Sequence, residues 1–199
     1  MNNPEYVKIG EKKYKINTDF RVAIECNVIA EDDTLGQYER ALAIIYKLFG
    51  DEGIDNSEDY EKLLELGQRY LLCGKEKELD GESKEKPDMD FVQDMEYIEA
   101  SFMSDYNIDL ENIEMHWWKF FKLINGLSNS EMGNCCVLNN IRNLRNMDLN
   151  EVKDQKLREK IRKAQQKVAL KKNQKPLTKD EIESIEEFNR LAGINREEW

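Results

Sequence analysis

Apolar and polar positions alternate most regularly between residues 91 and 127. In the first half of this stretch, apolar residues recur at the spacing of one helical face: Phe91, Met95, Ile98, Phe102 and Tyr106. A broader apolar stripe follows in the second half: Leu110, Ile113, Trp117, Trp118, Phe120, Phe121 and Ile124. Asn107 can adopt the left-handed conformation that ends a helix, and Asp109 can accept backbone N–H bonds that start the next one. We therefore predict two helices joined by a very tight turn at the centre of the fold.

The N-terminal segment has a different period. Between Tyr6 and Asn17, apolar residues alternate with lysines on either side of Gly10–Glu11, which is typical of a short β-hairpin. A lone hairpin is marginally stable in water. We therefore expect it either to pack against helices of its own chain or to pair with a strand of another copy.

Three helices are predicted after the hairpin. Thr18 is expected to cap the first, and Thr34 with Gln37 forms a capping box for the second, which Gly50 can end. The inward stripe of this second helix is expected to hold Leu35, Tyr38, Leu42, Ile45 and Phe49. Ser57 opens the third helix, which finishes before Gly74.

The remaining segments are richer in charge. Residues 75–90 have dense mixed charge and few apolar side chains, which predicts a flexible loop or linker rather than a docking strip. A further helix is expected over residues 130–145. Residues 147–172 have a thin apolar stripe and many lysines and arginines, which predicts an extended basic helix. Thr178 and Glu181 form a capping box for a short helix that ends at Leu191.

Together these patterns predict a mainly α protein, a helical bundle of about six to eight helices with a short N-terminal β-hairpin. We divide it into residues 1–74 (hairpin and helices), 75–90 (charged flexible loop), 91–147 (central helical hairpin and the following helix) and 148–199 (basic helix and short C-terminal helix). Residues 91–199 are expected to pack with residues 1–74 as one domain.

Composition agrees with this class. The 199 residues are 40% hydrophobic and 36% charged, with 3 prolines and 10 glycines. The formal net charge of −11 argues against a general nucleic-acid surface, because phosphate binding needs clustered lysine and arginine. Residues 1–16 are polar and charged rather than signal-like, and no apolar run has the length of a membrane span. The 4 cysteines are expected to be reduced thiols.

The sequence contains few residues arranged for catalysis or cofactor binding. His116 is the sole histidine, and Asn112 and Ile113 occupy the positions where a helical metal site would need a carboxylate. Neither a nucleophile motif nor a phosphate-cradling glycine run is evident. We therefore predict no catalytic, cofactor-binding or metal site. The basic stretch 153–175 is either a solvated helix or a surface for an acidic partner, a neighbouring subunit's acidic face or nucleic acid.

One set of residues carries a family resemblance: Asp94, Tyr97, Ile98, Ala100, Phe102, Tyr106, Ile108, Asp109, Leu110, His116, Trp117, Trp118 and Phe120. This pattern resembles a family of small bacteriophage and prophage proteins that are encoded next to the tape-measure gene of long-tailed phages. Its members are regarded as tail-assembly chaperones. The resemblance implies a non-enzymatic protein of the host bacterial cytoplasm that binds the tape-measure protein and keeps it soluble during tail morphogenesis. The alternatives are a minor structural component of the phage tail or virion, and an enzyme or metal protein of unrecognised type.

For partner binding we single out the aromatic side chains Tyr97, Tyr106, Trp117, Trp118 and Phe121. Consecutive residues such as Trp117 and Trp118 point about 100° apart on a helix, so both are buried only if the helix is covered on two sides. Otherwise one of them lies at an interface, where tryptophan is a favoured anchor. Self-association is also expected, through the N-terminal hairpin or the C-terminal segment. No membrane contact is expected, and the acidic net charge argues against nucleic acid as a partner.

Overall fold

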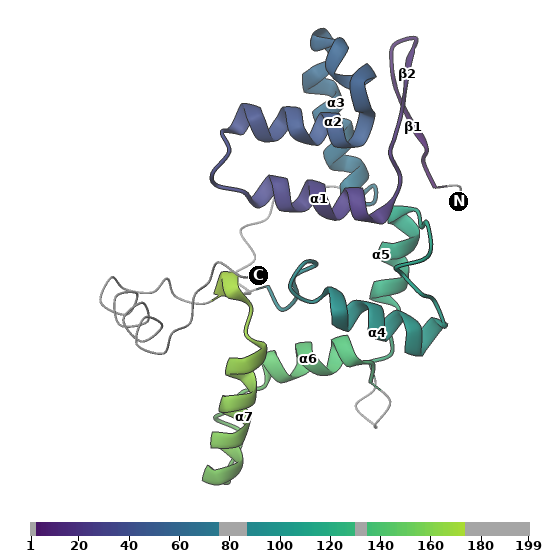
Figure 1. The fold of residues 1–199 in the computed structure, drawn as a ribbon. Coiled ribbons are helices and arrows are strands. Elements are labelled where there is room, and N and C mark those ends of the chain that lie inside the picture. Colours follow the sequence, from purple (N-terminus) through teal and green to yellow (C-terminus); the bar gives the residue numbers. More distant parts are fainter. Residues whose placement is uncertain (1–2, 76–86, 130–134, 174–199) are drawn as a thin grey trace, which may run out of the picture.

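The computed structural model describes residues 3–75, 87–129 and 135–173. Its elements in chain order are β1 (Tyr6–Ile9), β2 (Lys12–Lys15), α1 (Phe20–Glu31), α2 (Gln37–Asp55), the 3₁₀ turn η1 (Ser57–Asp59), α3 (Tyr60–Leu71), α4 (Met95–Tyr106), α5 (Trp117–Asn125), α6 (Val137–Asn146), α7 (Gln155–Val168) and the 3₁₀ turn η2 (Lys171–Asn173). Over these residues the chain is mainly helical with one short antiparallel hairpin, so the predicted fold class is confirmed (Figure 1).

The hairpin forms where its alternation predicted it. Val7 pairs with Tyr14, and Gly10 takes a φ of 58° in the turn, a conformation that glycine adopts without steric cost. Tyr14 is only 3% exposed, and its hydroxyl donates a 2.6 Å hydrogen bond to the carboxylate of Asp59. The hairpin therefore packs against the helices of its own chain.

Two predicted helix caps are displaced by a residue or more. The cap of α1 is Asp19 rather than Thr18, and its carboxylate accepts the backbone N–H of Arg21 at 2.8 Å. Helix α2 begins after Gly36, whose N–H donates to the Glu39 carboxylate at 2.7 Å. The capping box predicted from Thr34 is therefore wrong, because the threonine hydroxyl instead bonds to Asp32.

Helix α2 follows its prediction as far as Gly50. This glycine has non-helical backbone angles (φ 64°, ψ −156°), so the first helical segment ends there as predicted, and a second segment continues beyond the kink to Asp55. Ile45 and Phe49 are buried as predicted, but Tyr38 is 68% exposed and does not face inward.

The central helical hairpin is the main correction. Asn107 ends α4 with a φ of 52°, as predicted. The next helix, however, begins at Trp117 rather than at Leu110, so no very tight turn joins two abutting helices. Asp109 instead makes a local turn by accepting the N–H of Glu111 at 3.0 Å.

Long-range bonds explain why residues 108–116 are not helical. The N–H of Phe20 donates to the carbonyl of Met115 at 2.9 Å, and the N–H of Trp117 donates to the carbonyl of Thr18 at 2.8 Å. The Arg21 guanidinium donates to main-chain carbonyls on the same stretch, those of Leu110, Glu111 and Ile113. These bonds hold the segment as a non-helical loop against the start of α1, where the bonded backbone groups are satisfied without a helix.

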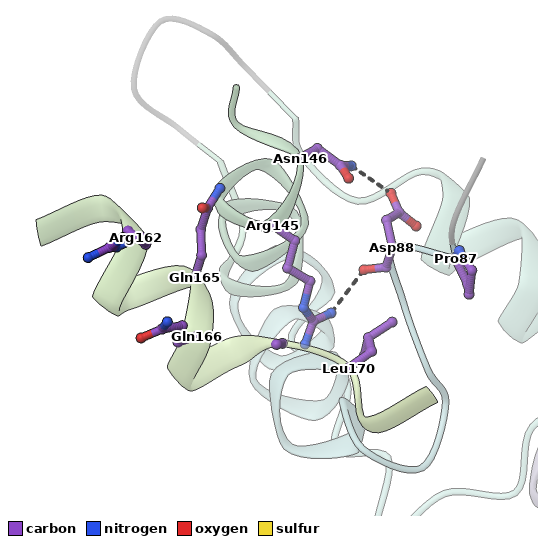
Figure 2. Close-up of a pocket in the computed structure, with 9 residues that line it drawn as sticks. Pro87, Asp88, Arg145, Asn146, Arg162, Gln165, Gln166 and Leu170 are labelled. Carbon is purple, nitrogen blue, oxygen red and sulfur yellow. Dashed lines mark hydrogen bonds between the residues drawn. The ribbon is translucent and has the colours of Figure 1, made fainter. Parts of the chain in front are cut away.

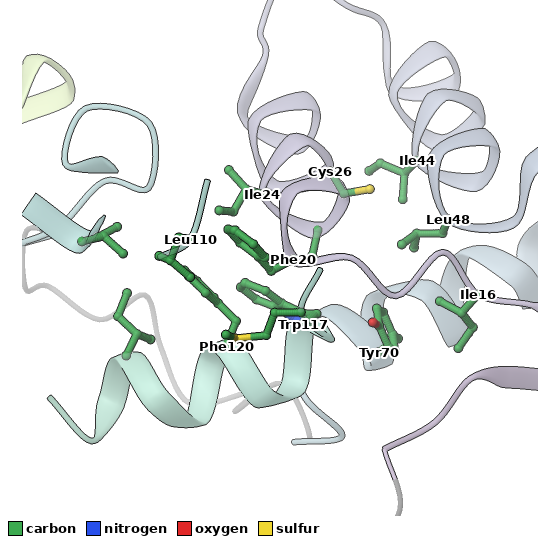
Figure 3. Close-up of a cluster of buried hydrophobic side chains, with 14 of the residues drawn as sticks. Ile16, Phe20, Ile24, Cys26, Ile44, Leu48, Tyr70, Leu110, Trp117 and Phe120 are labelled. Carbon is green, nitrogen blue, oxygen red and sulfur yellow. The ribbon is translucent and has the colours of Figure 1, made fainter. Parts of the chain in front are cut away.

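The core joins the two halves of the described chain (Figure 3). Phe20 of α1 stacks on Phe120 of α5 at a centroid distance of 4.5 Å, and Phe120 stacks on Phe102 of α4 at 5.2 Å. Trp117 lies 5.8 Å from Phe120 and is 2% exposed. Aromatic stacking across three helices therefore fixes α5 against both α1 and α4.

The basic segment is less helical than predicted. Helix α7 covers Gln155–Val168 rather than all of residues 147–172. The start of the predicted helix at Ser130, most of the predicted charged loop (76–86), the predicted helix 178–191 and Trp199 lie outside the described residues.

Candidate partner-binding surfaces

The sole histidine organises the start of α5. His116 is the N-cap, and its Nδ1 accepts the backbone N–H of Trp118 at 3.0 Å. Its Nε2 lies 2.9 Å from the carbonyl oxygen of Pro4. Because Nδ1 accepts, the ring proton is on Nε2 and is donated to Pro4. His116 therefore ties the N-terminal segment to α5.

The two tryptophans that follow it dock α5 onto the end of α3. The indole N–H of Trp117 donates to the carbonyl of Leu71, and that of Trp118 donates to the carbonyl of Tyr70, each at 2.9 Å. These are among the last carbonyls of α3, which lack partners within the helix. Trp118 also stacks on the Tyr70 ring at 6.2 Å. The consecutive tryptophans thus cap one helix while belonging to another.

The aromatic residues selected for partner binding are therefore largely structural. Trp117 is in the core, so its side chain offers no surface to a partner in this structure. Tyr97, Tyr106, Trp118 and Phe121 are half-buried. The Tyr106 hydroxyl donates to the Leu123 carbonyl at 2.9 Å, which joins α4 to α5. The edges of these four rings can reach a partner, and their binding role stays a prediction.

A groove on the opposite half of the molecule was not found from the sequence. It has a volume of about 800 Å³ and runs from the end of β2 along α1 and α2; its lining includes the apolar Ile16, Val22, Leu48 and Phe49 and the charged Lys15, Glu25, Lys47 and Glu52. Tyr46 also lines it and is 53% exposed. The sequence did contain one indication of this surface: Tyr46 falls outside the main apolar stripe of α2, so its ring is expected to point away from the core. Ile16, Leu48 and Phe49 are at most 5% exposed, so the accessible apolar surface of the groove comes from Tyr46 and the half-buried Val22. Apolar side chains bordered by charged ones suit an amphipathic helix.

Helix α7 forms a second unusual surface. None of its residues is buried, and Leu157 is 50% exposed. Four apolar residues nevertheless recur at helical spacing, and a lysine precedes each of them: Lys156–Leu157, Lys160–Ile161, Lys163–Ala164 and Lys167–Val168. Figure 1 shows α7 extending away from α6 at the lower edge of the molecule. The helix therefore presents adjacent apolar and basic rows.

The end of α7 is fixed by a buried ion pair. Arg145 of α6 donates to both carboxylate oxygens of Asp94, at 2.6 and 2.7 Å, to the carbonyl of Val168 at 2.6 Å and to that of Asp88 at 2.9 Å. Leu170, just beyond α7, is 1% exposed.

A cavity of about 330 Å³ lies beside this contact, and Figure 2 shows Asp88, Arg145 and Leu170 at its wall. Main-chain carbonyls and Asp94 already accept the Arg145 donors, so this guanidinium is engaged in the fold rather than directed at a ligand in the cavity.

Other chemistry is sparse in the part of the chain that the structure describes. Over residues 3–75, 87–129 and 135–173, no three His, Cys, Asp or Glu side chains are grouped so as to hold a metal ion. Desolvation raises the pKa of the Cys26 thiol to about 12 and that of Cys73 to about 11, which makes both weak nucleophiles. In the same ranges no helix has both the length and the apolar character needed to cross a bilayer.

Comparison with known proteins gives one match. The family described as "Bacteriophage Gp15 protein" matches residues 1–170, which includes every helix described above. Neither a curated protein nor a solved structure matches the chain.

Proposed function

The chain belongs to the Bacteriophage Gp15 protein family, and from this premise we propose that it is a tail-assembly chaperone. In this proposal it is non-enzymatic, binds the tape-measure protein in the cytoplasm of the host bacterium and keeps it soluble until the tail forms. The resemblance of the aromatic motif to proteins encoded beside the tape-measure gene supports the choice of client.

The groove over α1 and α2 is the observation that carries the proposal. A tape-measure protein is a long helical chain with apolar faces, and such a segment binds where an apolar floor is bordered by charged side chains. Ile16, Leu48 and Phe49 lie beneath the groove at 5% exposure or less, so its accessible apolar surface comes from the half-buried Val22 and from Tyr46, which is 53% exposed. In this proposal the Tyr46 ring covers the apolar side of a bound helix. The exposed edges of Trp118 and Phe121 serve as a second, smaller contact.

In this proposal the charged rim of the groove sets the orientation of the bound client helix and allows its release. Lys47 and Glu25 pair across it at 2.5 Å, and Lys15 and Glu52 lie along the same lining. Exposed pairs of this kind add little affinity but disfavour clients with the wrong charge pattern.

Co-expression with the adjacent tape-measure gene product tests the proposal. The expected result is a larger soluble fraction of the client in the presence of this protein, and loss of that gain with Tyr46→Glu. The matched control is Tyr38→Glu, because Tyr38 is an exposed tyrosine of the same helix outside the groove. If the wild-type protein left the solubility of the client unchanged, the proposed chaperone function would be wrong. If the two variants increased client solubility equally, only the assignment of the groove as the binding site would be wrong.

Mass spectrometry of purified phage particles separates the chaperone from a minor structural component of the tail or virion. A chaperone leaves before the particle is complete, so its peptides are expected to be absent from particles and present in the lysate of infected cells.

A further inference from the structure

Helix α7 carries a strong positive charge that the described structure does not neutralise. Residues 155–168 contain six basic residues and one acidic residue. The acidic residue, Glu159, pairs with Arg162 at 2.7 Å. Lys156, Lys160 and Lys163 are exposed and make no ion pair with any described residue. An exposed lysine row of this kind attracts acidic surfaces.

A surface of the opposite sign lies where α2 turns into α3. Residues 51–65 contain seven acidic residues and one lysine. We call the exposed side chains of this turn the acidic end: Asp51, Asp55, Glu58, Glu61 and Glu65. Lys12 lies 2.6 Å from Glu58 and Lys62 lies 2.5 Å from Glu65, but these exposed pairs are weak and leave carboxylate lone pairs for a further cation.

The two rows match in spacing when the helices run in opposite directions. Lys156, Lys160 and Lys163 are separated by four and then three positions, as are Glu65, Glu61 and Glu58 taken in reverse order. When α7 runs antiparallel to η1 and the start of α3, Lys156 lies opposite Glu65 and Lys160 opposite Glu61 of α3, and Lys163 lies opposite Glu58 of η1. The apolar row beginning at Leu157 borders these contacts and would lose exposed surface in them.

The two surfaces cannot meet within one molecule. In Figure 1, α2 and α3 lie at the top of the molecule and α7 lies at the bottom. We propose that α7 of one copy binds the acidic end of a second copy, antiparallel to the start of α3, through these three lysine–glutamate pairs.

Such a contact joins two different surfaces, so it is heterologous. The copy that contributes α7 keeps its acidic end free, and the copy that contributes its acidic end keeps α7 free. Association therefore proceeds head to tail into a ring or an open chain. A chain of copies of this kind would cover an extended partner at regular intervals. The contact uses neither Tyr46 nor the groove, so it stands or falls independently of the proposed function.

Sedimentation of the full-length protein tests the contact. At low ionic strength we expect association that grows with protein concentration, and we expect monomers in 1 M salt, where screening extends over only about 3 Å. The triple variant K156E/K160E/K163E and the triple variant E58K/E61K/E65K are each expected to remain monomeric at both salt concentrations. Their helicity should match that of the wild type, because all six side chains are exposed.

An equimolar mixture of the two variants is the decisive sample. In the first variant both α7 and the acidic end carry glutamates at the contact positions, and in the second variant both carry lysines. Each variant alone therefore repels itself. In the mixture, α7 of one variant meets a surface of opposite charge on the other, so association is expected at low salt. The control K8E/K119E/K122E reverses three exposed lysines on other elements and should associate like the wild type. A wild-type protein that stays monomeric at low salt, or a mixture that stays monomeric, would overturn the proposal, as would disruption by the control. If α7 instead binds the chain's own residues 174–199 or another acidic protein, the two variants are not expected to associate with each other in the mixture.

Discussion

The Asp94 carboxylate and the Arg145 guanidinium form a two-pronged ion pair with side chains only 0% and 7% exposed. Asp94 immediately precedes α4, and Arg145 lies in the last turn of α6. A third bond from Arg145 reaches the carbonyl of Val168 at the end of α7. One arginine therefore joins three helices, and the position of the exposed α7 depends on a contact made in the interior.

Replacement of Arg145 by alanine is expected to lower the free energy of unfolding by roughly 3–5 kcal/mol, because it leaves a buried carboxylate without a cation. Arg142→Ala is the matched control. Its pair with Asp88 is partly exposed, at 35% and 30%, and its loss should cost about 1 kcal/mol or less. Urea titration measures both. Equal losses for the two variants would show that burial does not set the strength of the Arg145 contact.

His116→Ala is expected to lower the free energy of unfolding by about 0.5–2 kcal/mol through loss of the α5 N-cap. His116→Asn should recover part of this loss, since asparagine can accept the Trp118 N–H but does not reproduce the bond to Pro4. Thermal unfolding of the two variants checks the prediction. No difference between them would mean that the cap itself contributes nothing.

Trp117→Phe removes the donor to Leu71 and leaves that carbonyl without its bond, at an expected cost of about 1–3 kcal/mol. Trp118→Phe removes the equivalent donor to Tyr70, but the carbonyl of Tyr70 also accepts the N–H of Cys73. The loss should therefore be smaller for Trp118. Chemical denaturation at neutral pH compares them, and the reverse order would contradict this assignment.

The stability of the hairpin docking is expected to depend on pH through Tyr14. Desolvation, and then the hydrogen bond to Asp59, raises its pKa from 10.0 to about 12. Because the folded-state pKa lies above the unfolded value, the stabilisation is complete below pH 10 and is lost as the pH rises through 12. Unfolding measured between pH 8 and 12 should show this alkaline loss in the wild type and a weaker one in Tyr14→Phe. If the free energy of unfolding fell equally steeply with pH in the two proteins, Tyr14 would not be the source of the alkaline loss.

Cys26 is expected to resist alkylation in the folded protein, because it is buried and its pKa is raised to about 12. Mass spectrometry of peptides after treatment with iodoacetamide measures the modification. The thiol should react readily only after denaturation, with Cys73 reacting at an intermediate rate in the folded state because it is half-buried. Rapid labelling of native Cys26 would show that α1 and α2 separate easily.

Local patterns located several elements well. The alternation around Gly10, the helical spacing from Met95 to Phe102 and the stop at Asn107 all correspond to what the structure shows. Each of these signals acts within a few residues, so it survives in the folded chain. The burial of individual aromatic side chains was less accessible from the sequence, because Trp117 and Trp118 look alike there although only Trp118 approaches the surface.

The sequence by itself determined that this chain is a mainly helical protein with a short hairpin and a basic helix, since periodicity, turn residues and charge are properties of neighbouring positions. The tertiary structure decided that residues 108–116 form a non-helical loop, that the indoles of α5 cap α3, and that α1 and α2 border a groove. The physical reason is that these features depend on partners far apart in the chain. Arg21 and the carbonyls it bonds near Ile113 are an example: their contact overrides the local preference for a helix.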